Sequence, residues 1–270
     1  MKHAADSICM VGDSAYPARW LTSMGTSAPL VLWGAPTLAV GAGGPAYHMG
    51  RSPKRWFGVV GSRCPSADSL RLVSDAVRQA TSLGYGIVTG GASGVDAAAA
   101  KTARLLGAPV LNIVPMCGFH GLRAVCCAIS THVRSDTHDA EPDQVPFIAR
   151  HGAVSADNVL SLRPSGASFS TSAAMERNQL IYAAAECTLV VQPRFKVGGT
   201  WHGALSAHQR KLCPLLVAEE PDNMAYRAFR ALGFGNFGMD HAVRDTGLAD
   251  AIREAELGIQ PQLPFSAAGA

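Results

Sequence analysis

Three short glycine-bearing segments have the residue types and spacing expected of a phosphate-binding site. Each follows an apolar run and precedes a helical pattern: Gly61-Ser62-Arg63, Gly90-Gly91-Ala92-Ser93-Gly94 and Gly198-Gly199-Thr200. Glycine lets the backbone come close to a ligand, and the first N–H groups of a helix favour an anion. The hydroxyls of Ser62, Ser93 and Thr200 add hydrogen-bonding groups. We expect a phosphate-bearing ligand here; the alternative for each segment is a tight turn that only joins a strand to a helix.

Four charged or polar residues lie in or near these segments. The guanidinium of Arg63 can make paired hydrogen bonds to phosphate oxygens, or it can form a surface ion pair. Asp96 stands just inside a predicted helix, where it either binds a ribose hydroxyl or interacts favourably with the helix dipole. Arg177 and Asn178 begin a segment with an apolar continuation; they contact solvent at a helix end, or the phosphate or base of a ligand.

Several kinds of site are excluded by the same sequence. It has no GxxxxGK[ST] segment, no G-x-G-x-x-G followed by a suitably placed acidic residue, and no G-x-S-x-G elbow. Its nine histidines and seven cysteines show no metal-ligand spacing, and the odd number of cysteines favours free thiols over a disulfide framework. The sequence therefore predicts no catalytic residue, metal ion or cofactor, and it favours a binding protein over an enzyme.

Short apolar runs alternate with helical patterns over most of the chain. A strand at 56–60, a helix with its N-cap at Ser66 or Asp68, a strand in YGIVTGG, a helix in AAAAKTARLLG and a strand in APVLNIVP follow one another directly. Further helices and strands alternate from about residue 172, with NMAYRAFRALG as the closing helix. This succession predicts an α/β protein with a Rossmann-like, doubly wound, mostly parallel sheet and helices on both faces. The three glycine segments then meet at the carboxyl edge of the sheet.

The chain is long and apolar enough to form one large domain with a short extension. The 270 residues are 48% hydrophobic and 16% charged, with a net charge of +3. We expect an N-terminal extension and linker at 1–55, one Rossmann-like domain at 56–255 and a loose tail at 256–270, while 117–158 shows no sustained period. No signal peptide or apolar run of about 20 residues is present, so the sequence predicts a cytoplasmic protein without a membrane segment.

The order of these segments resembles the DNA-processing protein A (DprA, or Smf) family, within a Rossmann-like group that includes the Lonely-Guy phosphoribohydrolases. The matching stretches are YPARWLTSMGTSAPLVLWG, VVGSR, TGGASGVDAAAA, LSLRP and ERNQLIYAAAECTLVVQ. The sequence differs from the family pattern at Leu162 and Gln179, and in the stretch QPRFKVGGT.

This resemblance implies an extended Rossmann fold that binds single-stranded DNA and takes part in recombination during natural transformation, with a RecA-type recombinase as partner. It assigns binding to Arg63, to Gly90, Gly91, Gly94 and Asp96, and to Arg177 and Asn178. Two alternatives stay open: a phosphoribohydrolase acting on a nucleoside monophosphate, although V-G-G-T-W-H-G-A has no glutamate for acid–base work, and a nucleotide-signal sensor. Pairing of two copies through an exposed strand or helix is a further expectation.

Overall fold

The computed structural model describes residues 7–13, 16–34, 55–115, 158–164 and 171–259. The expected linker before residue 55, most of the segment 117–158 and the end of the tail lie outside these residues. The described strands form one nine-stranded sheet in the order β1-β2-β6-β5-β4-β3-β7-β8-β9. Its strands are β1 (Ser7–Met10), β2 (Val31–Gly34), β3 (Trp56–Gly61), β4 (Gly86–Thr89), β5 (Val110–Val114), β6 (Asn158–Ser161), β7 (Cys187–Val191), β8 (Leu215–Ala218) and β9 (Gly235–Phe237).

Seven strands, from β6 across to β9, run parallel, and β1 and β2 add an antiparallel margin. In the register of the central pair, Phe57 lies opposite Cys187 and Gly61 opposite Val191. Strands β4, β5 and β7 are short, mostly apolar and buried along their whole length, as expected where helices cover both faces of a parallel sheet. The predicted Rossmann-like, mostly parallel fold is confirmed.

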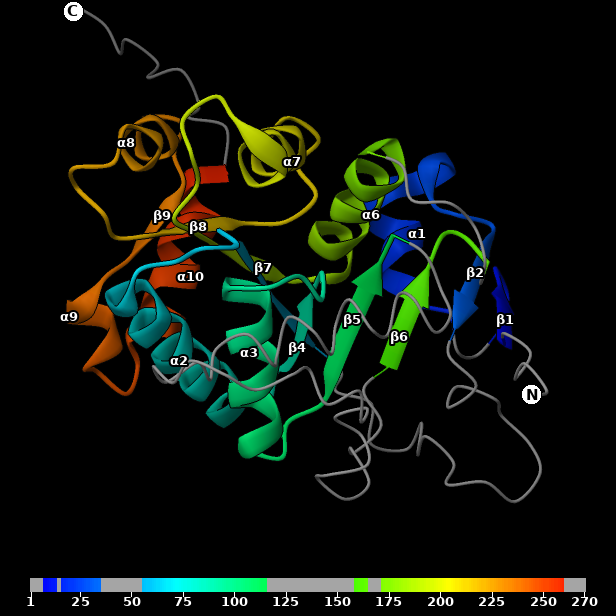
Figure 1. Ribbon diagram of the computed structural model, residues 1–270, viewed down its shortest axis with the longest axis horizontal. Helices are drawn as coiled ribbons and strands as arrows, with labels where there is room; N and C mark the ends of the chain where they lie inside the picture. The colour runs from blue at the N-terminus through cyan, green and yellow to red at the C-terminus, as the bar shows by residue number, and fades with distance from the viewer. Residues whose placement is uncertain (1–6, 14–15, 35–54, 116–157, 165–170, 260–270) are drawn as a thin grey trace, which may run out of the picture.

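Helices cover the two faces of the sheet in separate layers (Figure 1). One layer holds α1 (Ala18–Met24), α6 (Thr171–Ala184), α7 (Gly198–Gln209) and α8 (Met224–Ala231). The other holds α2 (Ala67–Ser82), α3 (Val95–Leu105) and α10 (Gly247–Ile259), with the short α9 (Met239–Ala242) beside α2. Apolar side chains fill the space between each layer and the sheet, among them Trp20 and Phe229 on the first face and Val73 and Ala99 on the second.

Helix α2 shows how the local sequence sets the first and last residues of a helix. Helix α2 begins after Ser66, whose Oγ accepts a hydrogen bond from Ser69 N, so one of the two expected N-caps is used. The helix ends before Gly84, which has a φ of +82°. A residue with positive φ stops a helix, and glycine adopts it without a Cβ penalty.

The N-terminal residues pack into the same core as the rest of the chain. Trp20 is fully buried and its Nε1 donates a hydrogen bond to Leu180 O at 3.0 Å, while Arg19 Nε donates to Ala185 O at 2.9 Å. Strands β1 and β2 join the sheet edge through β6. The predicted extension is thus in contact with α6 and the sheet; a domain boundary at residue 56 stays a prediction.

The expected closing helix at NMAYRAFRALG is not the last element of the chain. It is α8, and β9, α9 and α10 follow it. Strand β9 has three residues and α9 four, too short for a recognisable period. Helix α10 runs to Ile259 and so includes four residues, 256–259, that the sequence assigned to a loose tail.

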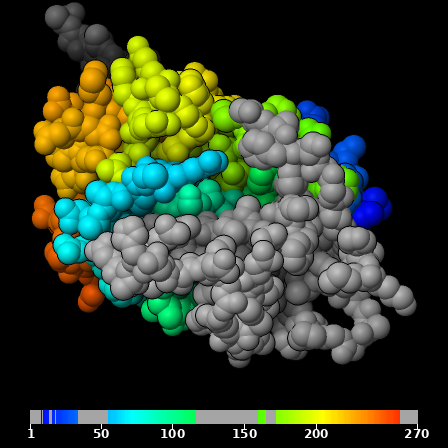
Figure 2. Space-filling view, in the orientation of Figure 1, coloured from blue at the N-terminus to red at the C-terminus, as the bar shows by residue number. Residues whose placement is uncertain are grey.

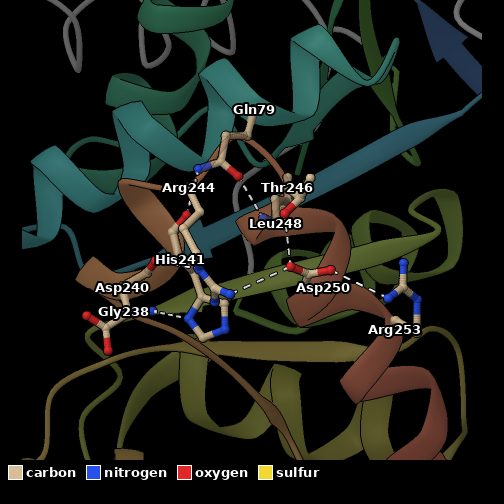
Figure 3. A network of polar contacts seen from close by, with 9 residues as sticks. All are labelled: Gln79, Gly238, Asp240, His241, Arg244, Thr246, Leu248, Asp250 and Arg253. Carbon is tan, nitrogen blue, oxygen red and sulfur yellow. Dashed lines mark hydrogen bonds and ion pairs between the residues drawn. The ribbon is translucent and has the colours of Figure 1, made fainter.

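A buried amide joins α2 to these last elements (Figure 3). Gln79 is 8% exposed, and its Nε2 donates to His241 O at 2.9 Å and to Ala242 O at 3.1 Å. Its Oε1 accepts from Leu248 N at 2.7 Å. These bonds satisfy Ala242 O at the end of α9 and Leu248 N at the start of α10, and they add to the bond that His241 O accepts from Arg244 N at 3.4 Å.

We expect Gln79→Leu to lower the free energy of unfolding by about 2 kcal/mol, because an apolar side chain cannot make these hydrogen bonds and leaves buried backbone groups unsatisfied. Urea denaturation measures the loss. The matched control is Gln209→Leu at the exposed end of α7, which we expect to change stability by less than about 0.5 kcal/mol. Equal stability of the two variants would contradict the prediction.

Candidate functional site: a cleft at the carboxyl edge

A cleft of about 760 Å³ lies at the carboxyl edge of the sheet, and we call it the edge cleft. Its walls come from the segments after β3, β4, β7 and β8 and from α3, α6 and α7. The strand order reverses here, because β3 has β4 on one side and β7 on the other. Such a reversal is where open α/β sheets bind ligands. Figure 2 shows the residues that lead into α2 (cyan) beside those around α7 (yellow) on the visible face.

The segment after β3 is held between two other elements by backbone and hydroxyl contacts. Ser62 N donates to Val191 O at 3.1 Å, and Val95 N donates to Ser62 O at 3.1 Å. Thr200 Oγ1 donates to Gly61 O at 3.1 Å. The end of β3 is therefore fixed against β7, α3 and α7, and its position in the cleft does not depend on a ligand.

Arg63 is exposed and lines the edge cleft. Its side chain makes no hydrogen bond or ion pair with any residue that the structure describes. A surface ion pair, the alternative considered from the sequence, is absent within the described residues. The guanidinium is available for a ligand.

The amino end of α7 also contributes to the wall. Gly198, Gly199 and Thr200 line the cleft, and the N-cap residue Val197 makes no side-chain hydrogen bond to the first turn. Gly198 begins the helix with a φ of +83°, a conformation that glycine adopts readily because it has no Cβ. The first N–H groups of a helix lack intrahelical partners, and the helix dipole favours negative charge at this end. This terminus suits a phosphate oxygen.

Two buried residues of opposite charge, Asp96 and Arg177, also line the cleft. Asp96 is 6% exposed and Arg177 is 7% exposed. Asp96 Oδ2 accepts hydrogen bonds from Gly90 N at 3.1 Å and Ala92 N at 3.3 Å, and Arg177 Nη1 donates to Gly90 O at 2.5 Å and Ile113 O at 3.1 Å. The two side chains join the glycine segment after β4 to β5 and α6.

Burial shifts the pKa of both groups against their charged forms. Desolvation raises the pKa of Asp96, although the charge of Arg177 and the backbone N–H groups act in the opposite direction. Desolvation lowers the pKa of Arg177, and the charge of Asp96 opposes that change. Arg177 Nε has no hydrogen-bond partner among the described residues. Asp96 and Arg177 thus hold the segment after β4 in place through bonds to its backbone. A phosphate contact by Arg177 stays a prediction.

The structure brings most of the predicted binding residues together. Those that line the edge cleft are Gly61, Ser62, Arg63, Asp96, Arg177, Asn178, Gly198, Gly199 and Thr200. Of the segment after β4, Ala92 is in the wall, whereas Gly90, Gly91, Ser93 and Gly94 are not. Gly94 instead packs against the backbone of Ser62 and Arg63, so its part is to position the neighbouring segment. Arg177 and Asn178 lie within α6, which begins at Thr171, rather than at its start.

Four polar residues that follow β7 and β8 also line the cleft and were not predicted from the sequence: Gln192, Arg194, Glu220 and Asn223. Gln192 and Arg194 follow β7, and Glu220 and Asn223 follow β8. The rule that the carboxyl ends of parallel strands share one edge could have found them. They carry no glycine motif, so nothing in their local sequence marked them.

The structure shows neither a metal site nor a membrane helix in its described part. Among the residues described, no three histidine, cysteine or acidic side chains cluster as metal ligands. Within the same residues, no helix is both long and apolar enough to cross a membrane. The cysteines whose side chains are described, Cys64, Cys187 and Cys213, are free thiols.

Residues 7–120 match the family model described as DNA recombination-mediator protein A. The resemblance to the DprA family is confirmed. This match runs from β1 past β5 and so includes the segment with Arg63 and the segment after β4. No curated protein matches the chain.

Solved structures of two DprA proteins have the same fold. DNA processing protein A from Streptococcus pneumoniae aligns with a TM-score of 0.62 at 16% identity, over 89% of this chain and 73% of that one. The Helicobacter pylori protein, whose structure concerns a single-stranded-DNA binding mode, aligns with a TM-score of 0.61 at 17% identity, over 94% of this chain and 99% of that one. The sheet and helices that the structure describes therefore have the arrangement found in these two DprA proteins.

Proposed function

We propose that this protein binds single-stranded DNA through the edge cleft and acts as a DprA-type recombination mediator. The observation that carries the proposal is the position of Arg63: an exposed guanidinium without a described partner, beside the uncapped amino end of α7, at the point where strand order reverses. The family match over residues 7–120 and the fold shared with the H. pylori DNA-binding protein support it.

The proposed binding set has two parts with different tasks. Arg63, Ser62, Asn178 and the α7 segment Gly198–Gly199–Thr200 contact phosphate oxygens, because they offer N–H, hydroxyl and guanidinium groups at the cleft wall. A second group holds the wall in place: Gly61, Gly90, Gly91, Ser93, Gly94, Asp96 and Arg177. Of these, Arg177 also keeps its predicted contact to phosphate. Binding through phosphates releases counterions, so affinity falls as salt rises.

Three finer statements belong to the same proposal and depend on the family resemblance. The bound strand is passed to a RecA-type recombinase, two copies of the chain pair with each other, and the protein works in the cytoplasm. Sedimentation equilibrium measures the pairing, and a monomer at every concentration would remove it from the proposal.

We expect Arg63→Ala to weaken binding of a labelled single-stranded oligonucleotide about tenfold, since a charge-assisted contact to phosphate contributes about 1.5 kcal/mol. Fluorescence anisotropy at about 50 and about 200 mM salt measures affinity and its salt dependence, and the variant should show a shallower salt slope. Arg253→Ala, which removes an exposed arginine of α10 outside the cleft, is the matched control. No binding by the wild type at low salt would contradict the proposed function; tight mononucleotide binding instead would support a nucleotide-binding protein.

A further inference from the structure

Glu220, just after β8, is a partly buried carboxylate in the wall of the edge cleft. Its Oε1 accepts a hydrogen bond from Gln192 Nε2 at 3.0 Å, and its Oε2 accepts one from Asn223 Nδ2 at 2.6 Å. An ionised carboxylate has about four acceptor positions, two on each oxygen. One position on each oxygen therefore stays available, and the two amides fix the direction in which the carboxylate points.

The two amides are themselves anchored to neighbouring loops. Gln192 Oε1 accepts from Ser66 N at 2.9 Å, and Asn223 Nδ2 also donates to Pro193 O at 3.2 Å. Asn223 Oδ1 caps α8 by accepting from Ala225 N at 2.8 Å. The loops after β3, β7 and β8 are thus tied together, and the carboxylate stands on a rigid support rather than on a free side chain.

A carboxylate among arginines is unusual in a cleft that binds only phosphates, because it repels them. It accepts hydrogen bonds from N–H and O–H donors instead. Within a continuous DNA strand the sugars carry no free hydroxyl, so the donors it can meet belong to the bases. Single-stranded nucleic acids present unstacked bases whose Watson–Crick edges are open to such contacts.

We propose that Glu220 reads an unstacked guanine. Guanine presents two adjacent N–H donors, N1–H and N2–H, which match the two remaining acceptor positions of a fixed carboxylate. Adenine and cytosine present one amino donor beside a ring nitrogen that accepts, and thymine presents its N3–H between two carbonyl oxygens; each of these places an acceptor against the carboxylate. The pairing is bidentate for guanine alone.

The rest of the cleft has the surface and space that a base needs. Phe195 lines the cleft and packs edge to face on Trp201, with ring centroids 5.1 Å apart. Aromatic side chains of this kind support bases in single-strand sites. The cleft volume of about 760 Å³ lies within the range of about 300 to 1,000 Å³ typical of small-ligand pockets. A nucleotide can therefore place its phosphate at Arg63 and its base toward Glu220.

This inference rests on the proposed function, and the experiment separates the two. Affinities are measured by anisotropy for oligothymidine with one central base replaced by guanine, adenine, cytosine or hypoxanthine. We expect the guanine oligonucleotide to bind about tenfold more tightly than plain oligothymidine, as is usual for a bidentate base contact. Hypoxanthine, which lacks the 2-amino group, should give an intermediate affinity, and this arm needs no protein variant.

Glu220→Gln should remove the guanine preference, and Glu220→Asp, which draws the carboxylate back, should reduce it to about twofold or less. Glu219→Gln is the matched control, because it removes the same charge from the adjacent exposed residue outside the cleft wall; it should keep the preference. Thermal unfolding checks that each variant folds.

Each outcome bears on a different claim. Equal affinities for all bases, with binding still dependent on Arg63, overturn the guanine inference and leave the proposed function standing. A guanine preference that persists in both Glu220 variants overturns the role of this residue. Absence of binding to every oligonucleotide at low salt overturns the proposed function and the inference with it.

Discussion

Arg177→Met should lower the free energy of unfolding by about 3–5 kcal/mol, because it removes the buried positive charge that stabilises the ionised form of the buried Asp96 carboxylate. Methionine fills a similar volume, so the loss reports charge rather than a cavity. The variant also gives up the hydrogen bonds from Arg177 Nη1 to Gly90 O and Ile113 O, which join β4 to β5. Urea denaturation of the wild type and the variant measures the difference.

The loss should depend on pH in a direction that follows from the pKa of Asp96. Burial already raises this pKa in the wild type, so the folded state binds a proton more readily than the unfolded state. Protonation of Asp96 therefore stabilises the folded state. This contribution is complete below the pKa of the unfolded state, about 4, and is lost as pH rises through the higher pKa of the folded state. Without Arg177 the folded pKa rises further, so we expect the deficit of the variant to be smaller at about pH 5 than at about pH 7.

The control for this prediction is the double variant Arg177→Met, Asp96→Asn. It removes both charges, and its amide oxygen can still accept from Gly90 N or Ala92 N. Replacing two buried opposite charges by neutral groups is often close to neutral in stability, so we expect the double variant to be more stable than Arg177→Met at about pH 7. A single variant as stable as the wild type, or a loss independent of pH, would contradict the role assigned to the pair.

Gly94→Ala should lower the free energy of unfolding by about 3–4 kcal/mol, the sum of a backbone conformation that side chains disfavour and a steric overlap. Gly94 has a φ of +78°. A Cβ there would overlap Ser62 O and lie 2.6 Å from the carbonyl carbon of Arg63. These neighbours are backbone atoms, which a rotamer change does not move aside. The segment that carries Arg63 must therefore shift, and we expect DNA binding to weaken along with stability.

Gly84→Ala is the comparison variant, because Gly84 combines a positive φ with free space around its Cα. Gly84 has a φ of +82°, and a Cβ built there meets no described atom within 4 Å. Its substitution should cost about 1 kcal/mol, from the backbone conformation alone, and should leave DNA binding unchanged. Urea denaturation and anisotropy of both variants give the comparison. An equal loss of unfolding free energy in the two variants would show that the contact between Gly94 and the Arg63 segment does not contribute to stability.

The regular elements of the chain were largely predictable from the sequence. Strand β3 and helices α2 and α3 combine continuous apolar runs, a serine cap and glycine stops, so local propensity and tertiary structure agree. Strands β1, β6 and β9 were missed, since each has three or four residues and no period to detect. Their pairing depends on neighbours far away in the sequence, such as β2 with β6.

In the edge cleft, too, some features follow from the local sequence and others depend on residues far apart in the chain. By itself the sequence determined that glycines follow β3, β4 and the loop after β7, and that Arg63 stands at the first of these turns, because such turns need particular residues at particular positions. Only the tertiary structure decided that Arg177 is buried with its Nη1 donating to Gly90 O and that Gln192 orients Glu220 in the cleft. Those contacts join residues between 28 and 87 positions apart. They depend on which strands become neighbours in the sheet, a property of the whole chain that no local pattern encodes.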